Sequence, residues 1–167
     1  TLKNIKNPNK GQLNVVDVWS APFPIAYGKE DLEAGAHAIS SLEAATAALK
    51  KGEVDVLVTA PIHKKSIQSD TFKFPGHTDY LNEQLEGDSL MFMVTDSLKV
   101  ALMSDHMPLK EVVGYLNEEK INAKIASLEK SLSQDFGIQR PKIAVLGINP
   151  HTGDNGVIGD EDDTLLT

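Results

Sequence analysis

The chain contains no cysteine. It therefore has neither disulfides nor thiolate metal sites, and any metal ion must be held by His, Asp or Glu. It also lacks an apolar run of the roughly 20 residues that span a bilayer, and Thr1–Asn9 shows neither the charged nor the apolar region of a signal peptide. These absences predict a cytoplasmic protein that does not span a membrane.

Basic residues are few, since 16 Lys and Arg stand against 24 Asp and Glu and give a formal charge of −8. There is no basic stripe with interleaved aromatic residues, which argues against nucleic-acid binding. An anionic substrate would need cations placed locally. The remaining composition is that of an ordinary soluble protein, and 167 residues are enough for one domain with its own core.

Apolar spacing alternates between helical and strand patterns along the chain, which is typical of α/β proteins. A helix is predicted over Asp31–Lys51, with Asp31 at its start. Further helices are predicted at Tyr80–Leu85 and Glu118–Phe136, and the acidic run Asp160–Asp163 suits the first turn of another. Strands are predicted at 13–19, 54–59, 90–95, 99–103 and 142–148, of which the third and fourth are close enough to form a hairpin.

The two ends of the sequence indicate a piece of a longer protein. Thr1–Gly11 is polar and loop-like, no start methionine is present, and the sequence stops as the last predicted helix begins. The expectation is a single α/β region over residues 1–167, truncated at both ends, with an incomplete functional site.

The distribution of histidines is the main functional signal. Four of the five lie within two residues of a proline, namely His63, His77, His106 and His151. Three of these follow an apolar run that predicts a buried strand, and open α/β sheets bind ligands outside the carboxyl ends of their strands. The pattern predicts a metal or anion site at one edge of a sheet, whereas His37 lies inside a helical pattern and is expected to be incidental.

His106 and His151 are the best candidate metal ligands, because each follows a predicted strand directly and stands close to a proline. Asp105 and Asp154 nearby are suited to orient or neutralise the site. The alternative is that each is an ordinary loop histidine bonded to backbone. The matching positions favour ligation, although a catalytic metal normally has three protein ligands and no third one is evident.

Gly76–Asp79 precedes a predicted helix and carries His77 and Thr78, two hydrogen-bond donors for an anionic substrate. The alternative, which spacing alone favours, is that Thr78 or Asp79 is an ordinary helix cap. The loop His63–Lys65 supplies positive charge that would suit a phosphate or carboxylate, or is simply solvated. No Walker loop, dinucleotide-binding glycine pattern or nucleophile elbow is present.

Four segments, in order along the chain, together resemble the 4-hydroxythreonine-4-phosphate dehydrogenase family. They are Val58-Thr59-Ala60-Pro61-Ile62-His63-Lys64, Phe74-Pro75-Gly76-His77-Thr78-Asp79-Tyr80-Leu81, Val100–Leu109 with its Asp105-His106-Met107-Pro108, and Leu146-Gly147-Ile148-Asn149-Pro150-His151-Thr152-Gly153-Asp154. The resemblance covers nearly the whole chain and corresponds to the middle of the family's sequence.

The resemblance implies an NAD-dependent enzyme of pyridoxal phosphate biosynthesis with an α/β/α layered fold like that of isocitrate and isopropylmalate dehydrogenases. The resemblance also implies a homodimer with active sites shared between subunits. They oxidise 4-phosphooxy-L-threonine, a small phosphorylated substrate, and the product then loses carbon dioxide to give 3-amino-2-oxopropyl phosphate. The implied cofactors are NAD and a divalent metal: zinc, magnesium or cobalt.

By the same resemblance, His77 and Thr78 bind substrate, and His106 and His151 are two of three metal ligands. The third ligand and further substrate contacts would lie beyond Thr167, so the fragment alone is expected to be inactive. Val157 stands where many family members have a second histidine. The general base and the NAD contacts have no assigned residue.

Two other functions remain open from the sequence. One is an NAD-dependent dehydrogenase of sugar acids such as 4-phospho-threonate or 4-phospho-erythronate, which the same scaffold would support. The other is a non-catalytic metal- or anion-binding domain.

Overall fold

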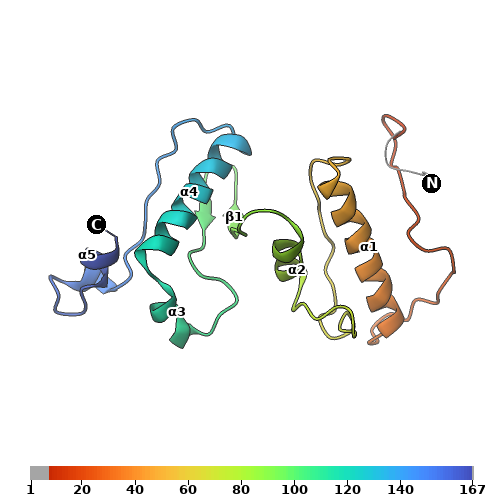
Figure 1. Ribbon diagram of the computed structural model, residues 1–167, viewed down its shortest axis with the longest axis horizontal. Coiled ribbons are helices and arrows are strands. Elements are labelled where there is room, and N and C mark those ends of the chain that lie inside the picture. The colour runs from red at the N-terminus through yellow and green to blue at the C-terminus, as the bar shows by residue number, and fades with distance from the viewer. Residues whose placement is uncertain (1–7, 167) are drawn as a thin grey trace. The chain divides into compact units, whose positions relative to one another are not determined.

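A computed structural model describes residues 8–166, so the predicted N-terminal loop Thr1–Gly11 lies partly outside the described residues. The chain divides into two compact units, an N-terminal unit (Thr1–Gly87) and a C-terminal unit (Asp88–Thr167), each treated by itself below (Figure 1). Within the described residues, no helix is both long enough and apolar enough to cross a membrane.

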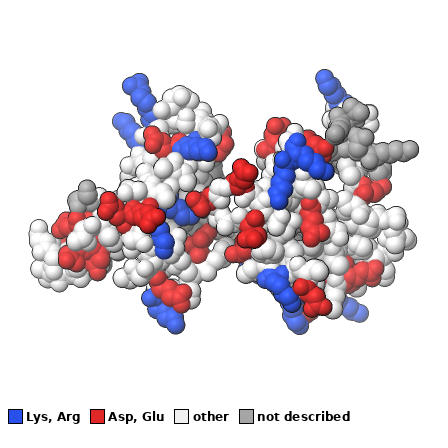
Figure 2. Space-filling view, in the orientation of Figure 1, with Lys and Arg blue, Asp and Glu red and all other residues white. Residues whose placement is uncertain are grey.

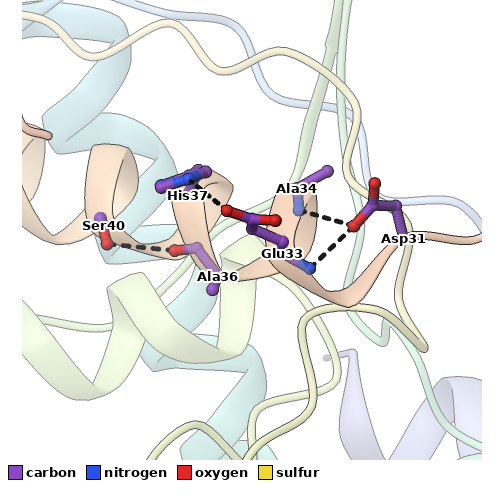
Figure 3. Close-up of polar contacts among 6 residues, drawn as sticks. All are labelled: Asp31, Glu33, Ala34, Ala36, His37 and Ser40. Atoms are coloured by element: carbon purple, nitrogen blue, oxygen red, sulfur yellow. Dashed lines mark hydrogen bonds and ion pairs between the residues drawn. The ribbon is translucent and has the colours of Figure 1, made fainter. Parts of the chain in front are cut away.

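The N-terminal unit is organised by helix α1 (Leu32–Lys50), which confirms the helix predicted from apolar spacing. Asp31 is the N-cap, and its carboxylate accepts hydrogen bonds from the N–H groups of Glu33 at 2.9 Å and Ala34 at 3.2 Å (Figure 3). These two N–H groups have no acceptor within the helix, so the cap fixes where α1 begins.

The core of this unit lies between α1, the turn that precedes Ile67, and helix α2 (His77–Gln84). It consists of the buried residues Ile39, Leu42, Ile67, Phe72 and Tyr80. The backbone of α1 comes very close to the turn at Gly35, where an added Cβ would overlap the carbonyl oxygen of Ser66. The small size of Gly35 therefore allows α1 to pack on this turn.

The C-terminal unit begins with strands β1 (Phe92–Val94) and β2 (Lys99–Ala101), which pair antiparallel with Met93 opposite Val100. This confirms the predicted hairpin, with shorter strands. Four helical elements follow: α3 (Leu109–Tyr115), α4 (Glu118–Gln134), the 3₁₀-helix η1 (Pro150–Gly153) and α5 (Glu161–Leu165). Helix α4 confirms the predicted helix, α5 starts in the acidic run as expected, and α3 was not predicted.

Three predicted strands are wrong, because residues 13–19, 54–59 and 142–148 are not strands and Figure 1 draws them without arrows. Apolar side chains in them are exposed, Val58 by 88% and Leu146 by 84%. A strand requires a neighbour for its N–H and C=O groups, and the only sheet among the described residues is the β1–β2 pair. An apolar sequence alone does not provide that neighbour.

Charge is mixed on the surface. On the face shown in Figure 2, acidic and basic side chains are interspersed, and Lys and Arg form no continuous patch. This view agrees with the formal charge of −8 and with the absence of a basic stripe in the sequence.

Candidate active site

His77 and Thr78 are the first two residues of α2, and both are half-buried. The N-cap is Gly76, which has no side chain to satisfy the first N–H groups, so the alternative that Thr78 or Asp79 caps the helix is wrong. A helix start that lacks a side-chain cap presents free N–H donors, and these favour an anion. The imidazole and the hydroxyl add two further donors at the same place.

Lys64 lies beside this helix start. A Cβ built on Gly76 would be 3.9 Å from Cε of Lys64, which places the lysine side chain against the backbone that precedes His77. The neighbouring Lys65 instead forms a 3.1 Å ion pair with Glu30. The two lysines of the predicted cationic loop therefore differ, and only Lys64 is brought close to the predicted substrate-binding pair.

Tyr80 anchors α2 one turn after its start. Its side chain is 7% exposed, and its ring centroid lies 5.3 Å from that of Phe72 and 5.4 Å from that of Phe74. Burial raises the pKa of the Tyr80 hydroxyl, and a hydrogen bond with Thr46 lowers it by a smaller amount. The start of α2 is thus anchored in the apolar core through Tyr80.

His63 has a structural role in this unit. Its Nδ1 atom lies 2.8 Å from Oγ of Ser66 and also accepts the backbone N–H of Ser66 at 3.3 Å. This is the geometry of a side chain that caps a turn. His63 also lines an open hollow of about 450 Å³ with Ser66 and the first turn of α1, and none of the four predicted site residues lies in its wall.

His37 is on α1, as expected, and takes part in a contact that the sequence did not indicate. Its ring is 4.4 Å from the ring centroid of Trp19 and 4.4 Å from that of Phe23. Among the described residues the Nε2 atom is buried without a hydrogen-bond partner, and Oε1 of Glu33 is 3.9 Å from it (Figure 3). His37 therefore packs Trp19 and Phe23 onto α1.

The two predicted metal ligands, His106 and His151, both belong to the C-terminal unit and are both exposed. Both also have left-handed backbone conformations, with φ of 46° at His106 and 53° at His151. Residues other than glycine rarely adopt this region, and such residues cluster at functional sites. The sequence pattern selected both positions as metal ligands, which stays a prediction, and it did not predict their backbone conformation.

His151 opens a longer left-handed segment. Every residue from His151 to Asn155 has a positive φ, as does Gly156. Two hydrogen bonds from later N–H groups close the segment, from Val157 to the Asp154 carbonyl at 3.2 Å and from Ile158 to the Gly153 carbonyl at 2.9 Å. The predicted turn is therefore a specific and compact structure.

Acidic side chains from the start of α5 hold the residues before His151. Asp162 accepts the N–H of Ile148 at 2.8 Å and that of Asn149 at 2.9 Å, one on each carboxylate oxygen. Glu161 accepts a 2.7 Å hydrogen bond from the side-chain amide of Asn149. The sequence predicted the helical turn but missed this role, because the partners are 12 to 14 residues apart.

These hydrogen bonds change the acidity of both groups. Burial of Asp162 would raise the pKa of its carboxyl, but the N–H groups of Asn149 and Ile148 outweigh this and hold the pKa below the ordinary 3.8. The backbone N–H of Glu161 and the Asn149 amide lower the pKa of the Glu161 carboxyl below the ordinary 4.5. Both side chains are therefore anionic acceptors near neutral pH.

The donor set for a metal is partial. Imidazole nitrogens are suitable ligands for zinc and cobalt, and His106 and His151 supply two of them. No group of three or more His, Asp or Glu side chains in residues 8–166 is arranged to hold a metal ion. The expected gathering of histidines at a sheet edge is likewise not found, since the β1–β2 hairpin is the only sheet in this part of the chain. The metal role of His106 and His151 therefore stays a prediction.

Comparison with known proteins identifies the family. The family model described as pyridoxal phosphate biosynthetic protein PdxA matches residues 1–167. The chain belongs to the PdxA family. This confirms the resemblance found in the four sequence motifs.

Individual PdxA relatives agree with this assignment. A 4-hydroxythreonine-4-phosphate dehydrogenase of Bacteroides thetaiotaomicron is 41% identical over 157 residues, which cover 93% of this chain and 43% of the relative. One from Sulfurihydrogenibium is 34% identical over 166 residues, which cover 99% of this chain and 51% of the relative. The chain thus spans about half the length of the curated relatives it matches.

Solved structures of PdxA relatives are also similar. The 4-hydroxythreonine-4-phosphate dehydrogenase of Klebsiella pneumoniae gives a TM-score of 0.75 at 34% identity, over 83% of this chain and 43% of that one. The one from Burkholderia phymatum gives 0.79 at 26% identity, over 97% of this chain and 50% of that one. The likeness agrees with the predicted α/β class.

Proposed function

We propose that the protein is an NAD-dependent dehydrogenase that oxidises 4-phosphooxy-L-threonine in pyridoxal phosphate biosynthesis. The oxidised product then loses carbon dioxide to give 3-amino-2-oxopropyl phosphate. The observation that carries this proposal is the match of the PdxA family along residues 1–167, with relatives named 4-hydroxythreonine-4-phosphate dehydrogenase at 41% and 34% identity.

In this proposal His77 and Thr78 bind the anionic substrate. They stand at a helix start without a side-chain cap, where the first N–H groups are suited to donate to an anion. Lys64 lies against the same backbone and adds the local positive charge that an acidic chain needs for a phosphate or carboxylate. The apolar anchor at Tyr80 keeps these donors in place before substrate arrives.

In the proposed enzyme His106 and His151 hold a divalent metal ion. This ion is zinc, magnesium or cobalt. Bound metal would supply Lewis acidity toward the substrate hydroxyl, and NAD would accept the hydride. Both histidines have exposed imidazoles and left-handed backbone, which supports a functional role for them. The remaining ligands, the NAD contacts and the general base belong to no assigned residue of this chain.

The layered α/β/α arrangement, a single α/β region over residues 1–167, the shared active sites of a homodimer and a cytoplasmic location are parts of the same proposal. The likeness to solved structures of PdxA relatives, with TM-scores of 0.75 and 0.79, supports the α/β part of this proposal.

The test is NADH formation by the complete gene product with a divalent metal, with 4-phosphooxy-L-threonine and 4-phospho-threonate offered in parallel. The proposal expects faster turnover of the amino substrate. A preference for the threonate would move the enzyme to sugar-acid catabolism. Absence of turnover with either substrate would contradict the proposal and favour a non-catalytic binding domain.

A further inference from the structure

The turn that carries His151 has a backbone that its sequence does not favour. Four of its residues other than glycine have positive φ, which are His151, Thr152, Asp154 and Asn155. L-residues avoid this region because Cβ crowds the backbone. Such a segment persists only when the surrounding structure over-determines it.

Asp162 makes two of the hydrogen bonds that hold the chain directly before this turn. Only 5% of this residue is exposed, and its two carboxylate oxygens accept the N–H groups of Ile148 and Asn149, directly before the turn. Gly147 gives the carboxylate room, since a Cβ there would be 3.1 Å from Oδ1 of Asp162 and 3.1 Å from Cγ2 of Thr152. One carboxylate therefore fixes the entry of the chain into the left-handed segment.

We propose that Asp162 is a positioning residue that fixes the conformation in which His151 presents its imidazole. The inference rests on the proposed function, which gives His151 its role as a metal ligand. Asp162 acts on the chain just before the turn, because its carboxylate accepts the backbone N–H groups of Ile148 and Asn149. Outer partners of this kind commonly tune metal affinity by orienting the ligand.

The decisive variant is Asp162→Asn, which preserves size and replaces one acceptor oxygen by a donor amide. At least one of the N–H groups of Ile148 and Asn149 then loses its acceptor. Asp160→Asn is the matched control, because it makes the same charge change two residues away at an exposed position without a side-chain cap hydrogen bond. Gly147→Ala is a second, milder variant, because its added Cβ comes into close contact with the Asp162 carboxylate without altering its charge.

The first readout needs no metal. Amide hydrogen exchange of residues 147–156 in the complete gene product, measured by mass spectrometry, should be faster in Asp162→Asn than in the wild type. It should be faster to a smaller degree in Gly147→Ala and unchanged in Asp160→Asn. If residues 147–156 exchange at the wild-type rate in both Asp162→Asn and Gly147→Ala, the inference is overturned.

The second readout is binding of cobalt(II) alone, followed by its visible absorption spectrum. Asp162→Asn should weaken cobalt binding by about 10- to 100-fold and alter the spectrum, since His151 no longer has a single orientation. Unchanged affinity and spectrum in Asp162→Asn would also overturn the inference. His151→Ala is measured beside it, and if that variant binds cobalt as the wild type does, the proposed metal role fails while hydrogen exchange still decides the role of Asp162.

Discussion

The two units hold their candidate site residues by different physical means. In the N-terminal unit, His77 and Thr78 stand on a helix that is anchored one turn later by buried Tyr80 in an aromatic core. In the C-terminal unit, His151 stands on left-handed backbone that is fixed by the carboxylate of Asp162. Apolar packing and charge-assisted hydrogen bonds respond differently to mutation and pH, so the two sets of residues should fail under different conditions.

The largest expected effect comes from removing the aromatic core of the N-terminal unit. Phe72 is 2% exposed, and Phe72→Ala should lower the free energy of unfolding by about 3 to 5 kcal/mol, because it leaves a cavity. Urea denaturation followed by far-UV circular dichroism, which reports the helices of both units, measures this loss. The control is Phe136→Ala in the C-terminal unit, where the residue is 39% exposed. Equal losses in the two variants would contradict the assignment of the core.

The contact between α1 and its neighbouring turn gives the next effect. Gly35→Ala places a Cβ on the carbonyl oxygen of Ser66, and overpacking against backbone should cost about 3 kcal/mol of stability. Gly114→Ala is the matched control, since Gly114 is also helical but has no heavy atom within 4 Å of the added Cβ. That control should stabilise by about 0.5 to 1 kcal/mol. Thermal unfolding of both variants checks the contrast, and a neutral Gly35→Ala would contradict the close approach.

The C-terminal unit should in turn be the more sensitive to acid. The pKa values of Asp162 and Glu161 are held below their ordinary 3.8 and 4.5. A lowered folded-state pKa means that the stabilisation is complete above the ordinary values and is lost as the pH falls through the lowered ones.

Hydrogen exchange of residues 147–156 between about pH 6 and pH 3, corrected for intrinsic rates, measures this dependence. Exchange in the wild type should show loss of protection at the acid end, whereas Asp162→Asn should show less protection throughout and a weaker dependence on pH. A parallel pH response in the two proteins would show that the carboxylate does not hold the turn.

The smallest effects are those of the two helix caps, one in each unit. Asp31 accepts two N–H groups of α1, whereas Asn117 accepts only that of Lys120 in α4, at 2.9 Å. Replacement of either by Ala should cost about 1 kcal/mol, with the larger loss at Asp31 because its negative charge also favours the helix start. Chemical denaturation of both variants ranks them, and a larger loss at Asn117 would reverse the expectation.

Local patterns predicted the elements whose determinants are local. Helix α1 with its Asp31 cap, helix α4 and the β1–β2 hairpin are all encoded by spacing, capping and proximity within a short segment. The start of α2 was placed three residues too late, because Pro75-Gly76 favoured a loop and Gly76 caps without a side chain. Residues 54–59 show where local prediction fails. A run of β-branched residues favours a strand, but a strand forms only if another strand pairs with it, and the local sequence does not specify that partner.

The metal role of His106 and His151 stays a prediction, and only the backbone at these positions is observed. Proline and strand-end patterns selected His106 and His151, and both proved to have unusual backbone. The role of Asp162 could not be predicted from sequence spacing, because its partners are 13 and 14 residues away and no period in the sequence links them. The sequence feature that relates to this role is a run of acidic residues soon after a turn rich in Gly and Asn.

The most direct measurement of the proposed enzyme is the rate of NADH formation together with bound metal in three variants of the complete gene product. His106→Ala and His151→Ala should lose both turnover and metal, because each removes a proposed ligand. His63→Asn, which retains a side-chain acceptor for the turn at Ser66, should keep both. Wild-type turnover and metal content in His106→Ala and His151→Ala would contradict the account.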